Sequence, residues 1–464
     1  MSAAAANLAA LERVYAVRPQ WQRVVRARDA LGLPDYTLLH AGPPYEDPRA
    51  PAAPVLSSAV LCCLYEKWAA TEAEAERLIA NGWVRLVSAQ AYGVVTPLAA
   101  VVSPSAMLVE VADPAAPARR AWSLLGSGAG PQIRFGSRNP AVLARLEWRD
   151  TVLARELASV LEAGPLDLLA LAAAGVAGGD DLHARTSAAT AALLTQIAPR
   201  LREPSVAAML ADTPLFFLTL WMAACHLMMS AAAESAVVAE PVATTEAAAG
   251  TEFIAATEPA NATELTAQTK PANATDPTAQ TEPAAMSKHP AATEPPAPAP
   301  ADRASRSAST LVIALAGNGR EVGIRVAGNP SVWTTRPGAA PAGPRLDPTA
   351  QHAVAPLTGD SGVIDAAGFG AQAFALAPEP ASALAAWLPP LWRDTQPTLL
   401  AGRHPGFATL RCALDAAAIT QHNSEPLAAI AMIGADGRTG LLGRGVYAAP
   451  VELFAAALNN LNPR

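Results

Sequence analysis

Residues 310–328, TLVIALAGNGREVGIRVAG, carry the clearest structural signal in the chain. Asn318 and Gly319 separate two apolar runs, and both residues readily adopt the positive φ that a type I′ turn requires at its two central positions. On either side of this pair, apolar side chains recur at every second residue, which is the period of a β-strand. The stretch therefore predicts a β-hairpin.

Counting outward from a two-residue loop gives the register of this hairpin. Leu315 then faces Val322 on a face that carries large apolar side chains. Ala316 faces Glu321 on the other face, which is shallow and also carries Arg325. We expect the first face to pack on the core and the shallow face to suit a ligand or a subunit contact.

The composition narrows the classes of function. The chain has 464 residues, a formal net charge of −7 and no basic stripe, so nucleic acid is not an expected partner. Its four cysteines show no CxxC spacing, which gives neither a disulfide framework nor a zinc pattern and fits a reducing compartment. The sequence contains no nucleophile elbow and no metal-ligand spacing. We therefore predict a cytoplasmic protein with no metal and no cofactor.

Residues 214–233, PLFFLTLWMAACHLMMSAAA, form the one segment with the apolar length of a minimal membrane span, roughly 18–20 residues. His226 lies inside this segment, and no basic flank orients it. At the start of the chain, Glu12 and Arg13 stand where a signal peptide needs its apolar core. We expect a buried core helix and no membrane partner; a single span is the alternative.

The sequence of helix and strand signals predicts a mixed α+β protein. We expect an N-terminal α/β domain over residues 1–138, beginning with one or two helices in 5–32, a helical module over 139–233 and a C-terminal α/β domain over 310–464. Residues 234–309 carry a twelve-residue near-repeat, TEPANATELTAQ followed by TKPANATDPTAQ, with almost no large apolar side chain. Such a segment cannot offset its ordering entropy, so we predict a disordered insert.

The densest polar cluster is DDLHAR at 180–185. On a helix, Asp181 and Arg185 would pair at i, i+4, and Asp180 would share a face with His183. His183 could then act as general acid or base, with Asp180 orienting its ring and Arg185 clamping an anion. The alternative is an ordinary helix N-terminal turn, with acids at the positive end of the helix dipole and a solvated ion pair.

Three further segments could contact a ligand. A strand leads into the loop at His40 and Gly42, and the end of such a strand is where α/β folds place ligands. The glycine-rich run around Gly128 could bring backbone N–H groups onto an anion. Asp360 and Ser361 stand beside glycines and could hold a ligand or cap a helix. In each case an ordinary turn or cap is the alternative.

Nine segments, taken in order, resemble the YlbE-like family, also called the AllG family. They cover both ordered regions and skip only the predicted insert. The segments are LLHAGPPY (38–45), YEKWAATEAEAERLIANG (65–82), GVVTPLAAVVSPS (93–105), IRFGSRNPAVLARL (133–146), GDDLHARTSAAT (179–190), FFLTLWMAAC (216–225), GNGREVGIRVAG (317–328), GDSGVIDAAGFG (359–370) and GRGVYAAPVELF (443–454).

The best-known members of this family are subunits of oxamate carbamoyltransferase in anaerobic allantoin breakdown. The resemblance therefore implies a transferase subunit that moves a carbamoyl group between phosphate and oxamate or oxalurate. It also implies companion subunits, one acyl-CoA-synthetase-like and one small, while a homo-oligomer stays open. The implied catalytic residues are His183, Arg185 and Asp180.

The predicted ligand-binding residues are His40, Gly42, Glu66, Gly128, Asn318, Glu321, Arg325, Asp360 and Ser361. Several other positions depart from the family pattern. Gln90-Ala91-Tyr92 stands where the family has a histidine-rich patch, and Leu182, Ala184 and Thr186 stand at the positions of a cysteine and two asparagines. The chain is therefore a divergent member by this resemblance. A catalytically relaxed scaffold subunit of the same kind of complex is the alternative function.

Overall fold

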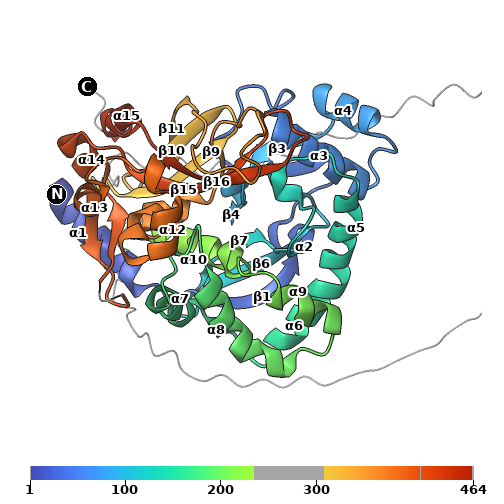
Figure 1. Ribbon diagram of the computed structural model, residues 1–464, viewed down its shortest axis with the longest axis horizontal. Helices are drawn as coiled ribbons and strands as arrows, with labels where there is room; N and C mark the ends of the chain where they lie inside the picture. The colour runs from blue at the N-terminus through green and yellow to red at the C-terminus, as the bar shows by residue number, and fades with distance from the viewer. Residues whose placement is uncertain (1, 235–307, 408, 462–464) are drawn as a thin grey trace, which may run out of the picture. The chain divides into compact units, whose positions relative to one another are not determined.

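The computed structural model describes residues 2–234, 308–407 and 409–461. The predicted insert at 234–309 lies outside these residues except at its two ends. The described residues group into one compact unit, which Figure 1 shows in blue to red. The division of the ordered chain into three domains stays a prediction.

Helices and strands alternate through both described parts of the chain, which confirms the predicted mixed α+β class. The largest sheet has the strand order β4-β7-β6-β1-β8, formed by Val94–Val95, Ala116–Leu124, Met107–Asp113, Gln20–Arg26 and Leu166–Asp167. A second sheet has the order β11-β10-β9-β12, formed by Asn329–Pro337, Glu321–Val326, Val312–Asn318 and Thr358–Gly359.

Three smaller sheets complete the described strands. One has the order β3-β2-β5, formed by Arg85–Ser88, Thr37–His40 and Val101–Val102, and β2 and β3 run parallel. The other two are hairpin-like pairs, β13-β14 (Leu400–Arg403 and Arg411–Leu414) and β15-β16 (Leu427–Ile433 and Leu441–Ala448).

The helices of the first part are α1 to α10, at Ala3–Ala16, Ala27–Leu31, Ala53–Tyr65, Glu72–Ala80, Ala141–Trp148, Ala154–Leu161, Leu168–Ala177, Ser187–Ile197, Pro204–Ala211 and Phe217–Ala231. Those of the second part are α11 to α15, at Gly362–Ala367, Pro378–Ala383, Trp392–Thr395, Ala416–His422 and Val451–Leu461.

The prediction of helices through 5–32 is wrong in its middle, because Gln20–Arg26 forms strand β1. Backbone pairing decides this: β1 lies between β6 and β8, where Val24 faces Val109 and Trp21 faces Leu166. Tertiary pairing of this kind overrides local helix propensity, which is a weak guide.

The predicted hairpin at 310–328 is confirmed, but its predicted register is wrong by two residues. Val322 faces Gly317, and the residues between the two strands are Gly319 and Arg320 and not the predicted Asn318 and Gly319. The Asn318 side chain causes this, since its Oδ1 accepts the backbone N–H groups of Arg320 and Glu321 at 2.9 and 2.8 Å. Because this slip is two residues and not one, the side chains from Ala314 to Arg325 keep their predicted faces. An irregularity between Arg325 and Val326 then shifts the pairing by one residue, so Val326 faces Val312, which the alternation assigns to the opposite face.

The shallow face of the hairpin is covered by the chain itself. Every residue of β9 is buried. A Cβ added at Gly323 would lie 2.9 Å from Trp333 and 3.3 Å from Pro43, so no room is left above that strand. Glu321 accepts a hydrogen bond from Thr335 at 2.9 Å. The face expected to meet a ligand or a subunit therefore packs inside the fold.

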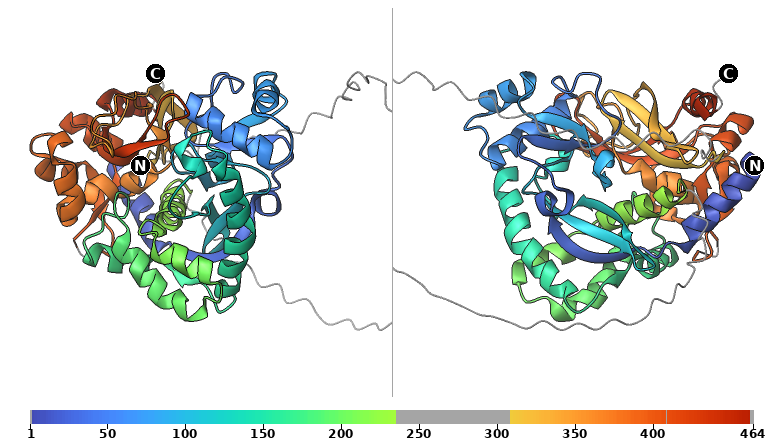
Figure 2. Two further views of the ribbon diagram at one scale, coloured as in Figure 1. Left: turned by 45° about the vertical axis from the view of Figure 1, so that its right-hand side comes forward. Right: turned by 180° about the vertical axis from the view of Figure 1, so that it is seen from behind.

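Helix α10 is the buried helix predicted at 214–233. All of its residues except Ser230 are buried. It packs against β6 and β7 on one side and against α11 and β9 on another, and Figures 1 and 2 show it in green between these layers. No helix in the described parts of the chain has the length and apolarity to cross a membrane. The core-helix interpretation is therefore confirmed.

His226 of α10 makes the fold sensitive to acid. Burial, with a smaller contribution from Arg325, lowers the pKa of His226 to about 3. The unfolded chain takes up a proton near pH 6.5, so stability that is present above this pH is lost as the pH falls toward 3. In His226→Leu the slope of unfolding free energy against pH between 4 and 6 should fall by about 1.4 kcal/mol per pH unit.

Urea denaturation of His226→Leu and the parent protein across pH 4–8 measures this slope. At pH 8 both side chains are uncharged, so the difference there gives the packing effect alone. An unchanged slope would contradict the account of a neutral, buried imidazole.

Gly42, in the loop after β2, packs closely against the backbone of strand β9. Its φ is +80°, and an added Cβ would lie 2.4 Å from the carbonyl carbon of Gly317 and 2.6 Å from the amide nitrogen of Asn318. Gly42→Ala should therefore lower the unfolding free energy by about 2–5 kcal/mol, combining left-handed strain with a backbone clash.

Gly32→Ala is the matched control for this substitution. Gly32 has φ +63° and no neighbour within 4 Å of an added Cβ, so only the conformational cost of about 1–2 kcal/mol applies. Equal losses in the two variants would show that the close approach at Gly42 does not limit stability.

Candidate functional site

The candidate site is a cavity of about 390 Å³. Its walls come from the segment His183–Ser187, the loop at Pro97–Leu98, the start of α10 and the strands β15 and β16. Arg134 and Ser361 also line it. Its volume is within the range of roughly 300–1,000 Å³ that is usual for small-molecule sites.

The polar cluster at 180–185 lies on this cavity but is not helical. Helix α7 ends at Ala177 and α8 begins at Ser187, so the helical spacing assumed for the cluster is wrong. The Asp181 carboxylate accepts the backbone N–H groups of His183, Ala184 and Arg185 at 3.2, 2.8 and 2.8 Å. Burial nevertheless raises the pKa of Asp181 to about 6. The carboxylate fixes a loop that presents His183.

Leu182 shows how tightly this loop is held. Its φ is +69°, a left-handed value that is unusual for a branched side chain. The side chain is fully buried, and its backbone N–H donates to the Arg185 carbonyl at 3.0 Å. Strain of this kind persists only where surrounding contacts determine the backbone, and it is frequent at functional sites.

His183 is oriented by Asp365 and not by Asp180. Its Nδ1 lies 2.7 Å from Asp365 Oδ2, and Asp365 is fully buried at the centre of α11. Asp365 Oδ1 accepts the backbone N–H groups of Ala371 and Ala429 at 2.8 and 3.0 Å. With Nδ1 held as the donor, Nε2 is the nitrogen left for chemistry.

Gly370 makes the approach of His183 to Asp365 sterically feasible. A Cβ at this position would lie 2.2 Å from the Asp365 carboxylate and 3.1 Å from the His183 Cβ. The Gly370 N–H also donates to the Asp181 carbonyl at 2.7 Å. Sequence reasoning missed Asp365. The available signal was one acid among small apolar residues in GVIDAAGFG.

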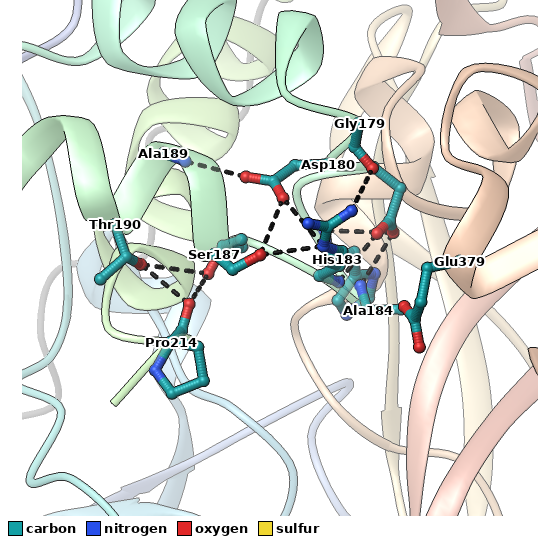
Figure 3. Close-up of polar contacts among 12 residues, drawn as sticks. Gly179, Asp180, His183, Ala184, Ser187, Ala189, Thr190, Pro214 and Glu379 are labelled. Carbon is teal, nitrogen blue, oxygen red and sulfur yellow. Dashed lines mark hydrogen bonds and ion pairs between the residues drawn. The ribbon is translucent and has the colours of Figure 1, made fainter. Parts of the chain in front are cut away.

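Asp180 and Arg185 form a separate contact on the same loop. Arg185 Nε lies 3.5 Å from Asp180 Oδ1 and donates to Ser187 at 2.8 Å, so the predicted pairing of Arg185 with Asp181 is wrong. Asp180 also accepts the Ala189 N–H at 2.8 Å, and burial raises its pKa. Figure 3 shows the Asp180 carboxylate with its contacts to Ala189 and Ser187.

Two other arginines line the cavity, and they differ in whether a carboxylate neutralises their charge. Arg444 of β16 is paired with Glu379, at 2.5 and 3.0 Å, and it donates to the Ala184 carbonyl at 3.2 Å. The Arg134 side chain forms no hydrogen bond or ion pair with any residue that the structure describes, and its guanidinium lies 4.9 Å from the ring centre of Phe135. Burial lowers the pKa of Arg134 to about 10, so it stays cationic at neutral pH.

Three of the predicted ligand-binding residues, Gly42, Arg325 and Asp360, meet in a buried network through the Gln90 side chain. Asp360 accepts the Gly42 N–H at 2.9 Å and the Gln90 side-chain amide at 2.7 Å. Arg325 donates to Gln90 at 2.5 Å. His40, two residues before Gly42, is fully buried, and burial lowers its pKa to about 4. Burial raises the pKa of Asp360 to about 6. Ser361, the next residue, lines the cavity itself.

The remaining predicted ligand-binding residues lie away from the cavity lining. Glu66 accepts the backbone N–H and the hydroxyl of Ser105 at 2.7 and 2.8 Å, so it fixes a loop. Gly128 lines a separate, smaller cavity of about 30 Å³. Asn318 and Glu321 belong to the hairpin turn. Among the residues that the structure describes, no three or more His, Cys, Asp or Glu side chains are arranged to hold a metal ion.

Comparison with known proteins identifies the class of protein that this fold and site represent. The family of the oxamate carbamoyltransferase subunit AllG matches residues 84–285 and 246–361. This match extends over more than half of the chain. The chain therefore belongs to the AllG family, as a divergent member.

Two curated relatives from Escherichia coli K12 are similar to the chain. The oxamate carbamoyltransferase subunit AllG is 34% identical over 245 residues, which is 50% of this chain and 58% of the relative. The uncharacterized protein YahG is 28% identical over 240 residues, 49% of this chain and 50% of the relative. The chain thus spans only about half the length of these relatives.

A solved structure has the same fold over nearly the whole chain. It is a conserved protein of unknown function from Enterococcus faecalis V583, with a TM-score of 0.76 and 20% sequence identity. The alignment covers 98% of this chain and 97% of that protein. At this identity the similarity supports the fold alone.

The Asp365 carboxylate both orients the His183 ring and accepts two backbone N–H groups. Asp365→Asn should separate these two roles. The amide oxygen can still accept the N–H groups of Ala371 and Ala429, but the amide nitrogen then faces His183 Nδ1 and requires it to be an acceptor. We expect a nearly unchanged fold and a shift of the His183 proton from Nδ1 to Nε2. Imidazole ¹⁵N chemical shifts measure the tautomer.

Asp365→Ala is the companion variant, because it removes the acceptor of both backbone N–H groups. Each orphaned donor costs about 1–3 kcal/mol, so this variant should lose about 2–6 kcal/mol of unfolding free energy. If Asp365→Asn leaves the His183 tautomer unchanged, Asp365 does not set the state of the ring.

Proposed function

We propose that this chain is a subunit of a carbamoyltransferase that moves a carbamoyl group between phosphate and an amide acceptor such as oxamate. The observation that carries the proposal is the His183–Asp365 pair, whose histidine lines a cavity suited to a small molecule. Membership of the AllG family supplies the reaction class. The transfer to oxamate itself rests on what the relative's name states.

His183 would carry the proton of the reaction. In the direction of oxalurate synthesis, the oxamate nitrogen attacks the carbamoyl carbon of carbamoyl phosphate. A C–N bond forms, the C–O bond to phosphate breaks, and phosphate leaves. Nε2 accepts the proton that the attacking nitrogen loses, while Asp365 holds Nδ1–H and stabilises the resulting imidazolium. In the reverse direction Nε2 returns this proton to the departing oxamate nitrogen.

The cationic side chains would stabilise the charge that develops on the phosphate and the carbonyl oxygen. Arg185 and Arg134 line the same cavity as His183. Fixed positive groups in a cavity with few waters act at a lower dielectric constant than in solution, and they need no reorganisation during the reaction. Arg134 is the stronger candidate because Asp180 already neutralises part of the Arg185 charge.

We also propose that the chain works in the cytoplasm within a complex of companion subunits. The relative is itself named as a subunit. The four cysteines are free and buried, which suits a reducing compartment. An acyl-CoA-synthetase-like subunit and a small subunit are the companions that the family resemblance implies.

A catalytically relaxed scaffold subunit is the second candidate function. Two cationic side chains of the cavity are already neutralised by acids of the chain itself, since Arg444 is paired with Glu379 and Arg185 with Asp180. This favours a role without catalysis. A subunit that only assembles the complex needs the fold and no free proton carrier. In that case substitution of His183 should change neither assembly nor turnover.

His183→Ala in the reconstituted complex tests both candidates. The mixture contains the chain, its companion subunits, oxamate and carbamoyl phosphate, and the measurement is phosphate release. General acid–base catalysis contributes about 10²–10⁴-fold, so turnover should fall by at least about 100-fold while the complex still assembles. Size-exclusion chromatography checks assembly.

His352→Ala is the matched control, since His352 is exposed and does not line the cavity. It should keep the turnover of the parent. No phosphate release from the complete parent mixture would reject carbamoyl transfer to oxamate, and equal turnover of His183→Ala and the parent would assign the chain to the scaffold role.

A further inference from the structure

Many of the polar groups that line the cavity already bind other parts of the chain. Thr186 donates to the Pro214 carbonyl at 2.9 Å. Figure 3 shows Thr190, which donates to the same carbonyl. The paired or hydrogen-bonded side chains are Arg185, Thr186, Ser187, Glu379 and Arg444. These groups gain little by turning to a ligand, because each would first have to break a contact with the protein.

Arg134 and Ser361 are different. Arg134 Nε and Ser361 Oγ are both buried, and neither has a hydrogen-bond partner among the described residues. Buried polar groups without partners are costly, so such atoms in a cavity indicate a ligand that supplies the partner. The backbone segments that carry them contact the same loop: the Arg134 carbonyl accepts the Ala99 N–H at 3.0 Å, and Gly359, two residues before Ser361, packs directly on the backbone of Leu98.

A carboxylate suits this pair of donors. A guanidinium presents a planar fork of N–H groups that matches the two oxygens of a carboxylate, and a hydroxyl can add a further donor. Among the described residues no carboxylate neutralises Arg134, so one negative charge from a ligand would balance it.

Most of the surface that lines the cavity is apolar. It is formed largely by Leu98, Phe135, Leu215, Leu218, Ile430 and Leu441. Oxamate and carbamoyl phosphate expose almost only polar atoms, which would lose hydration against such a wall and gain no partner. A hydrocarbon group placed there gains about 25 cal/mol for each Å² of apolar surface removed from water. The wall therefore favours a ligand with a hydrocarbon side chain.

We infer that the cavity takes an N-carbamoyl amino acid with an apolar side chain. Its carboxylate binds Arg134 and Ser361, its carbamoyl group lies at His183 Nε2, and its side chain packs on the apolar wall. The position of the carbamoyl group rests on the proposed function. The carboxylate and the hydrocarbon side chain follow from the cavity alone.

Isothermal titration calorimetry of the full chain with four ligands tests this inference. N-carbamoyl-leucine should bind at least tenfold more tightly than N-carbamoylglycine and oxamate, which lack the hydrocarbon side chain. It should also bind at least tenfold more tightly than N-carbamoyl-leucinamide, which lacks the negative charge.

Two cavity variants assign these preferences to their residues. Arg134→Gln should weaken N-carbamoyl-leucine at least tenfold and abolish the preference for the acid over the amide. Leu441→Asn, a change at a half-buried wall position, should reduce the preference for the leucine over the glycine derivative. Arg336→Gln is the control, because Arg336 is exposed and does not line the cavity; its affinities should equal those of the parent.

Equal affinity of the parent for the leucine and glycine derivatives, or for the acid and the amide, would overturn the inference. So would unchanged affinities in Arg134→Gln. These outcomes are separable from failure of the proposed function, because binding is measured without turnover. A chain that binds N-carbamoyl-leucine as expected but gives no phosphate release with oxamate supports the inference and rejects oxamate as the acceptor.

Discussion

The carboxylate of Asp365 is the contact on which the site depends. It is fully buried, and it joins three segments that are far apart in sequence: the His183 loop, the turn after α11 and strand β15. A buried carboxylate is tolerable only when hydrogen-bond donors surround it. Each of these segments must therefore supply its donor for the others to be stable, so the orientation of His183 is coupled to the folding of the second half of the chain.

Asp360 plays the equivalent structural role before the start of α11. It accepts N–H groups from the Gly42 loop, from Thr96 and from the Gln90 side chain, which all belong to the first half of the chain. The short helix α11 thus carries one buried carboxylate at its middle and has another beside its start. Between them, these two groups fix the cavity walls at the Pro97 loop and at His183. The cavity is consequently a product of the fold and not of a mobile surface loop.

Local patterns made the larger elements predictable, while the site depended on contacts that no local pattern reveals. The 310–328 hairpin and helix α10 were predictable because turn chemistry and apolar length are properties of adjacent residues. The hairpin register was not, because the Asn318 side chain and the pairing of Asn318 with Thr358 in β12 set the position of the turn. The sequence predicts a helix where the structure has the loop before α8, since a leucine at position 182 does not signal a positive φ. Asp365 was missed because one acid in an apolar run shows its partner only in three dimensions.

The central claim is that chemistry takes place in the cavity at His183 Nε2. A crystal structure of the protein with saturating N-carbamoyl-leucine tests it most directly. The account predicts ligand density in the cavity, with the carbamoyl group within hydrogen-bond distance of His183 Nε2 and the carboxylate on Arg134. Density at another surface, with the cavity filled only by water, would contradict it.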